Sequence, residues 1–177
     1  AKHTVLVIDA SASMNAQLSG SAEKRFEKAI DEAASRLQGK ISIVLATNIQ
    51  VIVMEKGTVA DARKVLATLK ARATTTHLGD AMLTAGELIG DDAKGTKVVV
   101  LSDFQSNIGT DVLVAKRAIA AKGAHVELVN VLGDNKNELS RLSNAGFVQL
   151  DVNKFQTIAL VKNYDDVQRA VDIAIIS

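Results

Sequence analysis

Apolar runs of strand length alternate with helix-length amphipathic segments along most of this chain. Residues 5–8, 41–45 and 98–101 are apolar and rich in β-branched side chains, as in strands that are buried on both faces. Longer segments, such as residues 23–37 and 78–89, carry apolar positions at helical spacing. Strands joined by such helices pair in parallel through right-handed crossovers. The pattern therefore predicts an α/β fold with a mostly parallel central sheet and helices on both faces.

One connection is too short to hold a helix. Residues 41–45 and 49–54 both have strand-like patterns, and only residues 46–48 separate them. A link of this length joins antiparallel strands in a hairpin. Because antiparallel edge strands are common in otherwise parallel sheets, we expect this hairpin to add one antiparallel edge strand.

The chain has 177 residues, which suits one domain, and we expect a single domain over its whole length. The stretch from about residue 150 to residue 177 has two interpretations. Residues 164–176 carry apolar side chains at helical spacing, which favours a terminal helix. Residues 157–161 have a strand-like pattern instead, and a hairpin that turns at residues 163–166 would begin a truncated second domain.

Composition excludes several classes of function. The net charge is +1 and aromatic residues make up 3%, so neither a basic field nor stacking platforms point to nucleic acid as a partner. The chain has no cysteine, which excludes disulfides, zinc–thiolate sites and thiol nucleophiles. No apolar run reaches the ~18 residues of a membrane-spanning helix. We therefore expect a soluble domain that does not itself span a membrane.

The first residue, Ala1, leads almost directly into a strand pattern. This start is typical of a processed product or of a domain cut from a longer parent. A membrane-anchored microbial protein, a partner of an ATPase and a surface adhesin are the candidates for such a parent, and the sequence leaves its compartment open.

Carboxylates and hydroxyls are concentrated where strand patterns end. Asp9, Ser11 and Ser13 follow the first strand, and Asp103 follows the strand at residues 98–101. Ligands of open α/β sheets bind outside the carboxyl ends of the strands, where the strand order reverses. In a sheet ordered 3-2-1-4-5-6 the first and fourth strands are neighbours, so both Asp residues would lie close together. The loop that carries Thr76, just before a predicted helix, would open on the same side.

These five side chains offer two carboxylates and three hydroxyls. Mg²⁺ prefers hard oxygen ligands in near-octahedral geometry at ~2.0–2.1 Å and retains several waters. Two negative charges balance a divalent cation, which leaves it electrophilic enough to accept one more anionic oxygen. An Asp or Glu side chain of a partner protein is a natural donor. The pattern therefore favours a Mg²⁺ site, with Mn²⁺ as the other candidate.

Each of these residues also has a purely structural explanation. Ser11 and Ser13 could stabilise the turn after the strand. Thr76 could be the N-cap of the next helix, and Asp103 could close the loop after its strand. The joint placement of the two carboxylates at the ends of adjacent strands favours the metal site.

Three motifs in this order resemble the von Willebrand factor A (vWA) family. Residues 9–13 match the Asp-x-Ser-x-Ser signature of its metal-ion-dependent adhesion site (MIDAS), residues 76–82 resemble its Thr-containing segment, and residues 98–103 resemble its strand ending in Ser-Asp. The resemblance covers residues 3 to about 146, and residues 163–171 loosely resemble the last helix of the family. It implies a Rossmann-like three-layer sandwich that binds Mg²⁺ or Mn²⁺ and recognises a carboxylate of a protein partner. The resemblance thus implies an adhesion or scaffold module and not an enzyme.

Two positions depart from the family pattern. Phe104 stands where the family often has Gly, and Thr74 and Thr75 stand where Gly-Gly often precedes the conserved Thr. These departures remove no ligand, but they change the loops that a partner would contact. Phe104 either lies at the edge of the site or packs under the sheet, and burial is more typical of a lone Phe. Next to the ligands we expect a partner-binding rim formed by Met14, Thr75, His77, Phe104 and Gln105.

The sequence contains no glycine-rich nucleotide motif and no Gly-x-Ser-x-Gly elbow, so we expect no catalytic residues. One enzymatic alternative is a Mg²⁺-dependent phosphoryl-transfer hydrolase with Asp9 as the nucleophile. That chemistry needs a lysine beside the phosphoryl group, and the first lysine after Asp9 is Lys24. A second alternative is a scaffold domain that binds its partner without metal.

Overall fold

The structure is a computed structural model that describes residues 1–72, 75–90, 93–132, 149–151 and 156–158. Its main feature is a five-stranded sheet in the order β3-β2-β1-β4-β5. The strands are β1 (His3–Asp9), β2 (Lys40–Ala46), β3 (Gln50–Gly57), β4 (Thr96–Ser102) and β5 (His125–Asn130). All neighbours pair in parallel except β2 and β3, which pair antiparallel at the edge. The predicted mostly parallel sheet with one antiparallel edge strand is confirmed.

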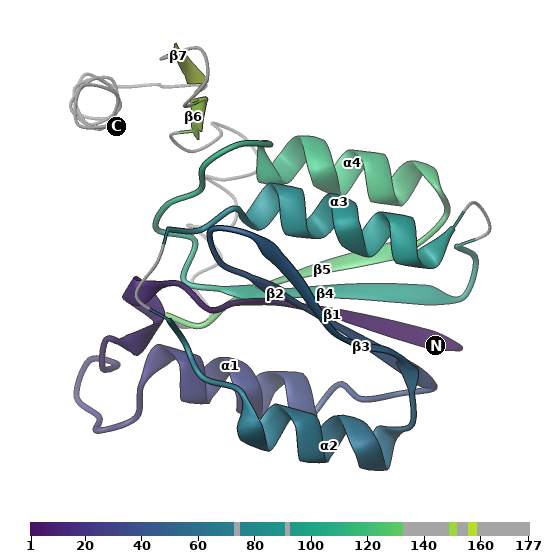
Figure 1. The fold of residues 1–177 in the computed structure, drawn as a ribbon, viewed down its shortest axis with the longest axis horizontal. Helices are drawn as coiled ribbons and strands as arrows, with labels where there is room; N and C mark the ends of the chain where they lie inside the picture. Colours follow the sequence, from purple (N-terminus) through teal and green to yellow (C-terminus); the bar gives the residue numbers. More distant parts are fainter. Residues whose placement is uncertain (73–74, 91–92, 133–148, 152–155, 159–177) are drawn as a thin grey trace.

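Helices cover both faces of this sheet, so the fold has three layers (Figure 1). Helices α1 (Arg25–Ala34) and α2 (Val59–Thr68) lie on one face, and α3 (Leu78–Ile89) and α4 (Val112–Ala121) lie on the other. A short 3₁₀ helix, η1 (Ala12–Asn15), follows β1. The Rossmann-like three-layer sandwich is thus confirmed. Within the described ranges, no helix is long and apolar enough to cross a membrane.

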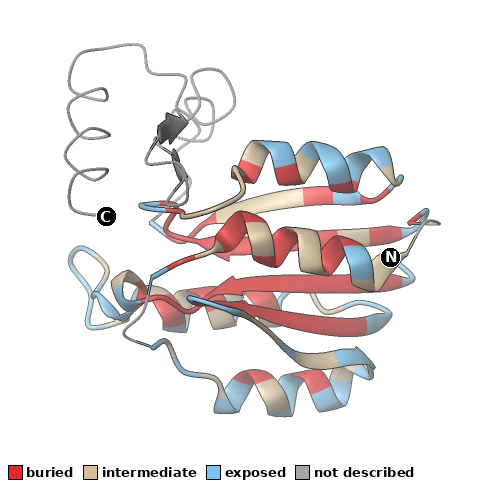
Figure 2. Cartoon of the chain, turned by 45° about the horizontal axis from the view of Figure 1, so that its top comes forward, coloured by how far each residue is buried: buried red, intermediate tan, exposed pale blue. Residues whose placement is uncertain are grey.

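Burial on both faces of the sheet explains the unbroken apolar run in strand β1. All seven of its residues are buried (Figure 2). Its apolar residues 5–8 alternate between two hydrophobic cores. Val5 and Val7 pack in the core under α3 and α4, whereas Leu6 and Ile8 pack in the core under α1 and α2. A strand in the middle layer has a hydrophobic core on each face. Its sequence is therefore apolar at successive positions, whereas a half-exposed strand alternates apolar and polar residues.

The helix boundaries agree with the sequence pattern at α3 and less closely at α1. The helix predicted at residues 78–89 is α3. The helix predicted at residues 23–37 is shorter, because α1 ends at Ala34. Leu37 packs against the core although it lies outside the helix. Its apolar side chain therefore extended the helical spacing in the sequence by one turn beyond the end of the helix.

Beyond residue 132 the structure describes only two short strands. β6 (Gln149–Asp151) and β7 (Gln156–Ile158) pair antiparallel in a sheet of their own. The two interpretations of the chain end, a helix at residues 164–176 or a hairpin turning at residues 163–166, lie outside the described residues.

The strand order places β1 in the middle of the sheet, with its carboxyl end between those of its neighbours. β1 pairs with β2 on one side and with β4 on the other, so the chain order of the sheet reverses at β1. Ile8 is opposite Leu101 of β4, and both strands end within the next residue. The polar residues that follow β1 and β4 therefore leave the sheet side by side, as the sequence predicted.

A close approach at the start of α3 holds the loop after β4 in place. A Cβ atom on Gly79 would overlap the carbonyl oxygen of Thr110, which lies in that loop. Later in the same helix, a Cβ atom on Gly86 would meet Ile119 Cγ1 at 3.4 Å and Lys122 Nζ at 3.8 Å, which are ordinary contact distances. Glycine is therefore sterically required at the first position and not at the second.

We expect Gly79→Ala to lower the free energy of unfolding by about 2–4 kcal/mol, because the backbone of the loop must move to admit the methyl group. The matched control Gly86→Ala should be neutral or stabilise by up to about 1 kcal/mol, since alanine favours the helix. Urea denaturation followed by circular dichroism measures both. Equal effects at the two positions would contradict the steric explanation.

Candidate metal centre

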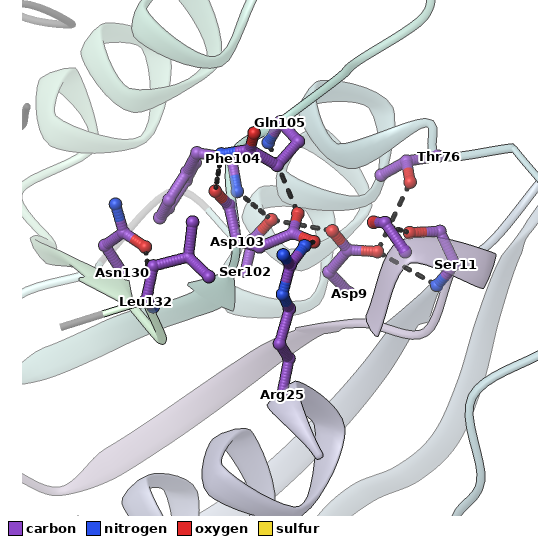
Figure 3. A network of polar contacts seen from close by, with 11 residues as sticks. Asp9, Ser11, Arg25, Thr76, Ser102, Asp103, Phe104, Gln105, Asn130 and Leu132 are labelled. Atoms are coloured by element: carbon purple, nitrogen blue, oxygen red, sulfur yellow. Dashed lines mark hydrogen bonds and ion pairs between the residues drawn. The ribbon is translucent and has the colours of Figure 1, made fainter. Parts of the chain in front are cut away.

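Asp9 is the last residue of β1, and its carboxylate is the point where three parts of the chain meet (Figure 3). It is 1% exposed. Its Oδ1 accepts hydrogen bonds from the Ser11 backbone N–H at 3.0 Å and from the Thr76 hydroxyl at 3.3 Å. Its Oδ2 accepts one from the Ser102 hydroxyl at 2.6 Å. Hydrogen-bond donors from the loop after β1, the loop before α3 and the end of β4 thus gather around one carboxylate.

Ser11 and Ser13 bring two hydroxyls together in the turn after β1. Their Oγ atoms are 3.3 Å apart, with Ser11 buried and Ser13 half-buried. The turn is closed by the backbone, since the Met14 N–H donates to the Ser11 carbonyl at 3.1 Å. The turn and the hydroxyl pair therefore use different groups of the same residues, and the structural explanation does not exclude a ligand role.

Thr76 is not the N-cap of α3. That position belongs to His77, whose side chain caps nothing, and Asn107 Oδ1 instead accepts from the Leu78 and Gly79 N–H groups at 2.8 and 3.2 Å. The Thr76 carbonyl accepts from the Ile108 N–H at 2.9 Å. The loop after β4 thus performs the capping, which leaves the Thr76 hydroxyl directed at Asp9. The N-cap explanation of Thr76 is wrong.

Asp103 follows β4 directly and is 1% exposed. Its Oδ1 accepts from the Gln105 N–H at 3.3 Å, which is the loop-closing role considered from the sequence. Its Oδ2 forms an ion pair with Arg25 Nη1 at 2.9 Å. One oxygen therefore stabilises the loop, and the other is paired with a cation from α1.

The environment of Asp9 disfavours its ionised form. Burial raises the pKa of Asp9 above its ordinary value, and the charge of Asp103 raises this pKa further. Hydrogen bonds from Ser102 and Ser11 act in the opposite direction. The ionised form of Asp9 is thus held at a cost to the fold, and a nearby positive charge would reduce that cost.

Sequence reasoning missed Ser102 and Arg25 as site residues. Ser102 could have been predicted from the strand register, because paired residues of neighbouring parallel strands project to the same face of the sheet. Ile8 is opposite Leu101, so the next residue of β4, Ser102, is the neighbour of Asp9. Arg25 had no local signal, since it is 78 residues from its partner Asp103 in sequence.

The predicted partner-binding rim needs correction at two positions. Met14 is fully buried and packs in the core under α1 and α2, and Phe104 is 5% exposed in the opposite core. Neither side chain faces solvent. Thr75 and Gln105 are exposed, and His77 is half-buried with its Nδ1 at 3.2 Å from Asp80 Oδ2. Of the five predicted rim residues, Thr75, His77 and Gln105 therefore remain accessible to solvent.

Phe104 has a backbone φ of 50°, in the left-handed region. A non-glycine residue there costs roughly 1–2 kcal/mol, and glycine avoids that cost. Phe104, at the position where the vWA pattern often has Gly, thus adopts a backbone conformation that glycine favours. Burial of the phenyl ring in the core offsets the backbone cost.

The chemistry of the donor set fits a hard divalent cation. Among the described residues, no three His, Cys, Asp or Glu side chains gather where they could hold a metal. A cation here would therefore depend on the hydroxyls of Ser11, Ser13 and Thr76 in addition to the carboxylates of Asp9 and Asp103. Sets made only of oxygen suit Mg²⁺ and Mn²⁺.

Comparison with known proteins places the fold. The sequence matches no family model and no curated protein. Among solved structures, the chain is similar to the conserved hypothetical protein BatB from Bacteroides thetaiotaomicron, with 17% identity and a TM-score of 0.64 over 98% of this chain and 97% of that one. An aerotolerance-related membrane protein from Bacteroides fragilis gives 18% identity and a TM-score of 0.60, over 71% of this chain and 65% of that one.

A third similar structure is proximal thread matrix protein 1 from the mussel byssus, described with a zinc-occupied MIDAS motif. It gives 16% identity and a TM-score of 0.55, over 81% of this chain and 45% of that one. At these identities the likeness concerns the fold alone. The neighbours support the vWA-like fold predicted from the sequence motifs.

We expect Asp9→Asn to raise the free energy of unfolding by about 1 kcal/mol at pH 7 in EDTA, because the variant removes a buried charge and keeps the shape. The pKa of Asp9 is raised in the folded protein, so its ionisation lowers stability as the pH rises. The advantage of the variant should therefore shrink as the pH is lowered toward the ordinary Asp value of 3.8. Urea denaturation at several pH values measures this difference.

The opposite result would be an Asp9→Asn variant that is less stable than the wild type by the same amount at every pH. In that case the hydrogen bonds from Ser11, Thr76 and Ser102 would outweigh the cost of burying the charge.

Proposed function

We propose that this chain is a divalent-metal-dependent protein-binding module of the adhesion or scaffold type. Its metal ligands are Asp9, Ser11, Ser13, Thr76 and Asp103, some of them acting through water. The cation is Mg²⁺ or Mn²⁺, and an Asp or Glu side chain of a partner protein completes its coordination. The whole chain forms the module, and we extend the proposal to a membrane-anchored microbial parent that displays it.

The observation that carries this proposal is the convergence on Asp9. Ser11 and Thr76 come from segments far apart in the sequence, yet both donate hydrogen bonds to Asp9 Oδ1. The resemblance to the MIDAS rests on these same segments. The zinc-occupied MIDAS of the mussel matrix protein is consistent with a metal role at such a fold, and it makes Zn²⁺ a third cation to test.

In this proposal the cation supplies a Lewis-acidic centre for an anionic oxygen. The protein residues hold the cation with a charge no greater than its own, so that a partner carboxylate remains attracted to it. The exposed side chains of Thr75 and Gln105 lie next to the ligands in sequence and would contact the partner around that carboxylate.

The hydrolase alternative is disfavoured by the environment of Asp9. A nucleophile must reach the phosphorus atom directly, but this carboxylate is 1% exposed and both of its oxygens accept hydrogen bonds. A metal ligand can act through a bridging water or beside the hydroxyls. We therefore propose a binding function with no catalytic residues.

Titration calorimetry of Mg²⁺ and Mn²⁺ into the EDTA-stripped protein tests the metal site. We expect saturable binding at one site, and a loss of affinity of about a hundredfold or more in Asp103→Ala, because a charged ligand is removed. The matched control is Asp31→Asn, which changes an exposed carboxylate on α1 and should bind like the wild type.

Other outcomes of this titration select the alternatives. Normal Mg²⁺ binding by Asp103→Ala would contradict the ligand assignment. An absence of binding at millimolar metal in the folded wild type would favour the metal-independent scaffold. Turnover of p-nitrophenyl phosphate that is lost in Asp9→Ala would favour the hydrolase.

A further inference from the structure

Arg25 is the first residue of α1, and its side chain reaches across to the candidate metal centre (Figure 3). Its Nη1 donates to Asp103 Oδ2 at 2.9 Å. Asp103 is one of the two carboxylates on which the proposed metal site depends. A guanidinium therefore lies against a carboxylate whose charge a metal ion would also use.

Burial makes this ion pair different from an exposed one. The side chain of Asp103 is 1% exposed and that of Arg25 is 23% exposed, so water screens the pair weakly. Arg25 Nε is buried and has no hydrogen-bond partner within the part of the chain that the structure describes. An unpaired buried N–H is costly, so the guanidinium is retained at this place by its charge and not by a complete set of hydrogen bonds.

The neighbouring backbone is anchored independently of this side chain. The Arg25 N–H donates to the Ala16 carbonyl at 2.9 Å, and the Ala16 N–H donates to the Ser13 carbonyl at 3.1 Å. Gln17 and Lys24 form a further antiparallel bridge. The start of α1 is thus tied to the turn that carries Ser11 and Ser13. The guanidinium can leave Asp103 toward solvent while the backbone stays in place.

We propose that Arg25 competes with the divalent cation for Asp103 and thereby sets the affinity of the metal site. This inference rests on the proposed metal-binding function. A cation that binds near Asp103 Oδ2, directly or through a water, must either displace the guanidinium or tolerate its like charge nearby. Both routes cost free energy, so the arginine weakens metal binding.

The test is a calorimetric titration of Mg²⁺ into EDTA-stripped wild type, Arg25→Gln, Arg25→Lys and Lys24→Gln. Arg25→Gln should bind Mg²⁺ about tenfold more tightly or better, because close charge pairs typically couple by more than one decade in affinity. Arg25→Lys keeps the positive charge but loses the planar fork of donors. Its affinity for Mg²⁺ should therefore lie between those of the wild type and Arg25→Gln. Lys24→Gln is the matched control, since it removes one exposed positive charge at the adjacent position, and it should bind like the wild type.

Thermal unfolding gives a second readout that a merely structural role would not reproduce. In EDTA, Arg25→Gln should melt below the wild type, because Asp103 is left buried without its counter-charge. Saturating Mg²⁺ should then raise the melting temperature of Arg25→Gln more than that of the wild type. A residue that only supports the fold would lower both the stability and the metal affinity.

Several outcomes would overturn the competition. One is unchanged or weaker Mg²⁺ binding by Arg25→Gln. Another is a gain in affinity by Lys24→Gln equal to that of Arg25→Gln, because the effect would then come from net charge. If Arg25→Gln does not fold, Arg25→Lys must still bind more tightly than the wild type for the inference to stand. Failure of the proposed function is distinguishable, because then neither the wild type nor any folded Arg25 variant binds Mg²⁺. Binding by Arg25→Gln alone would support both the site and the competition.

Discussion

The burial of Asp9 at the end of the central strand is the constraint on which the site depends. A carboxylate that is 1% exposed loses almost all of its hydration, and burial accordingly raises its pKa. The surrounding structure compensates with three donors, from the backbone N–H of Ser11 and the hydroxyls of Thr76 and Ser102. These donors lie on three different segments, so the buried charge also fixes how the loops meet.

The fold was predictable because its elements obey local rules. β1 lies between two cores, and its unbroken run of apolar, mostly β-branched residues is typical of a strand buried on both faces. The three-residue link at residues 46–48 required a hairpin, and the structure pairs β2 with β3 antiparallel. The end of α1 was not predictable, because Leu37 packs on the core without being helical. Apolar residues at helical spacing indicate which side chains are buried. They indicate a helix only where the backbone also forms helical hydrogen bonds.

The site was predictable only in part, for a different reason. Asp9, Ser11 and Thr76 could be placed together because strand order and chain direction determine where strand ends meet. Whether a side chain next to them faces solvent depends on backbone torsion and on packing. Phe104 turns into the core at a φ of 50°, and Met14 is buried beneath the turn that it belongs to. The pairing of Arg25 with Asp103 depends on the exact position of the start of α1, which no local pattern specifies.

Charge balance connects the arginine to the kind of partner that the site would accept. Asp9 and Asp103 together carry two negative charges, and Arg25 reduces the local excess to one. A divalent cation then leaves one net positive charge, provided that the guanidinium stays nearby. One carboxylate of a partner neutralises that charge, whereas without the arginine the same carboxylate would make the site negative. The residue that weakens the metal would thus strengthen the attraction of an anionic partner to the metal-loaded site. By linkage, a partner carboxylate would in turn help to retain the cation. Metal and partner are then expected to bind more tightly together than either does alone.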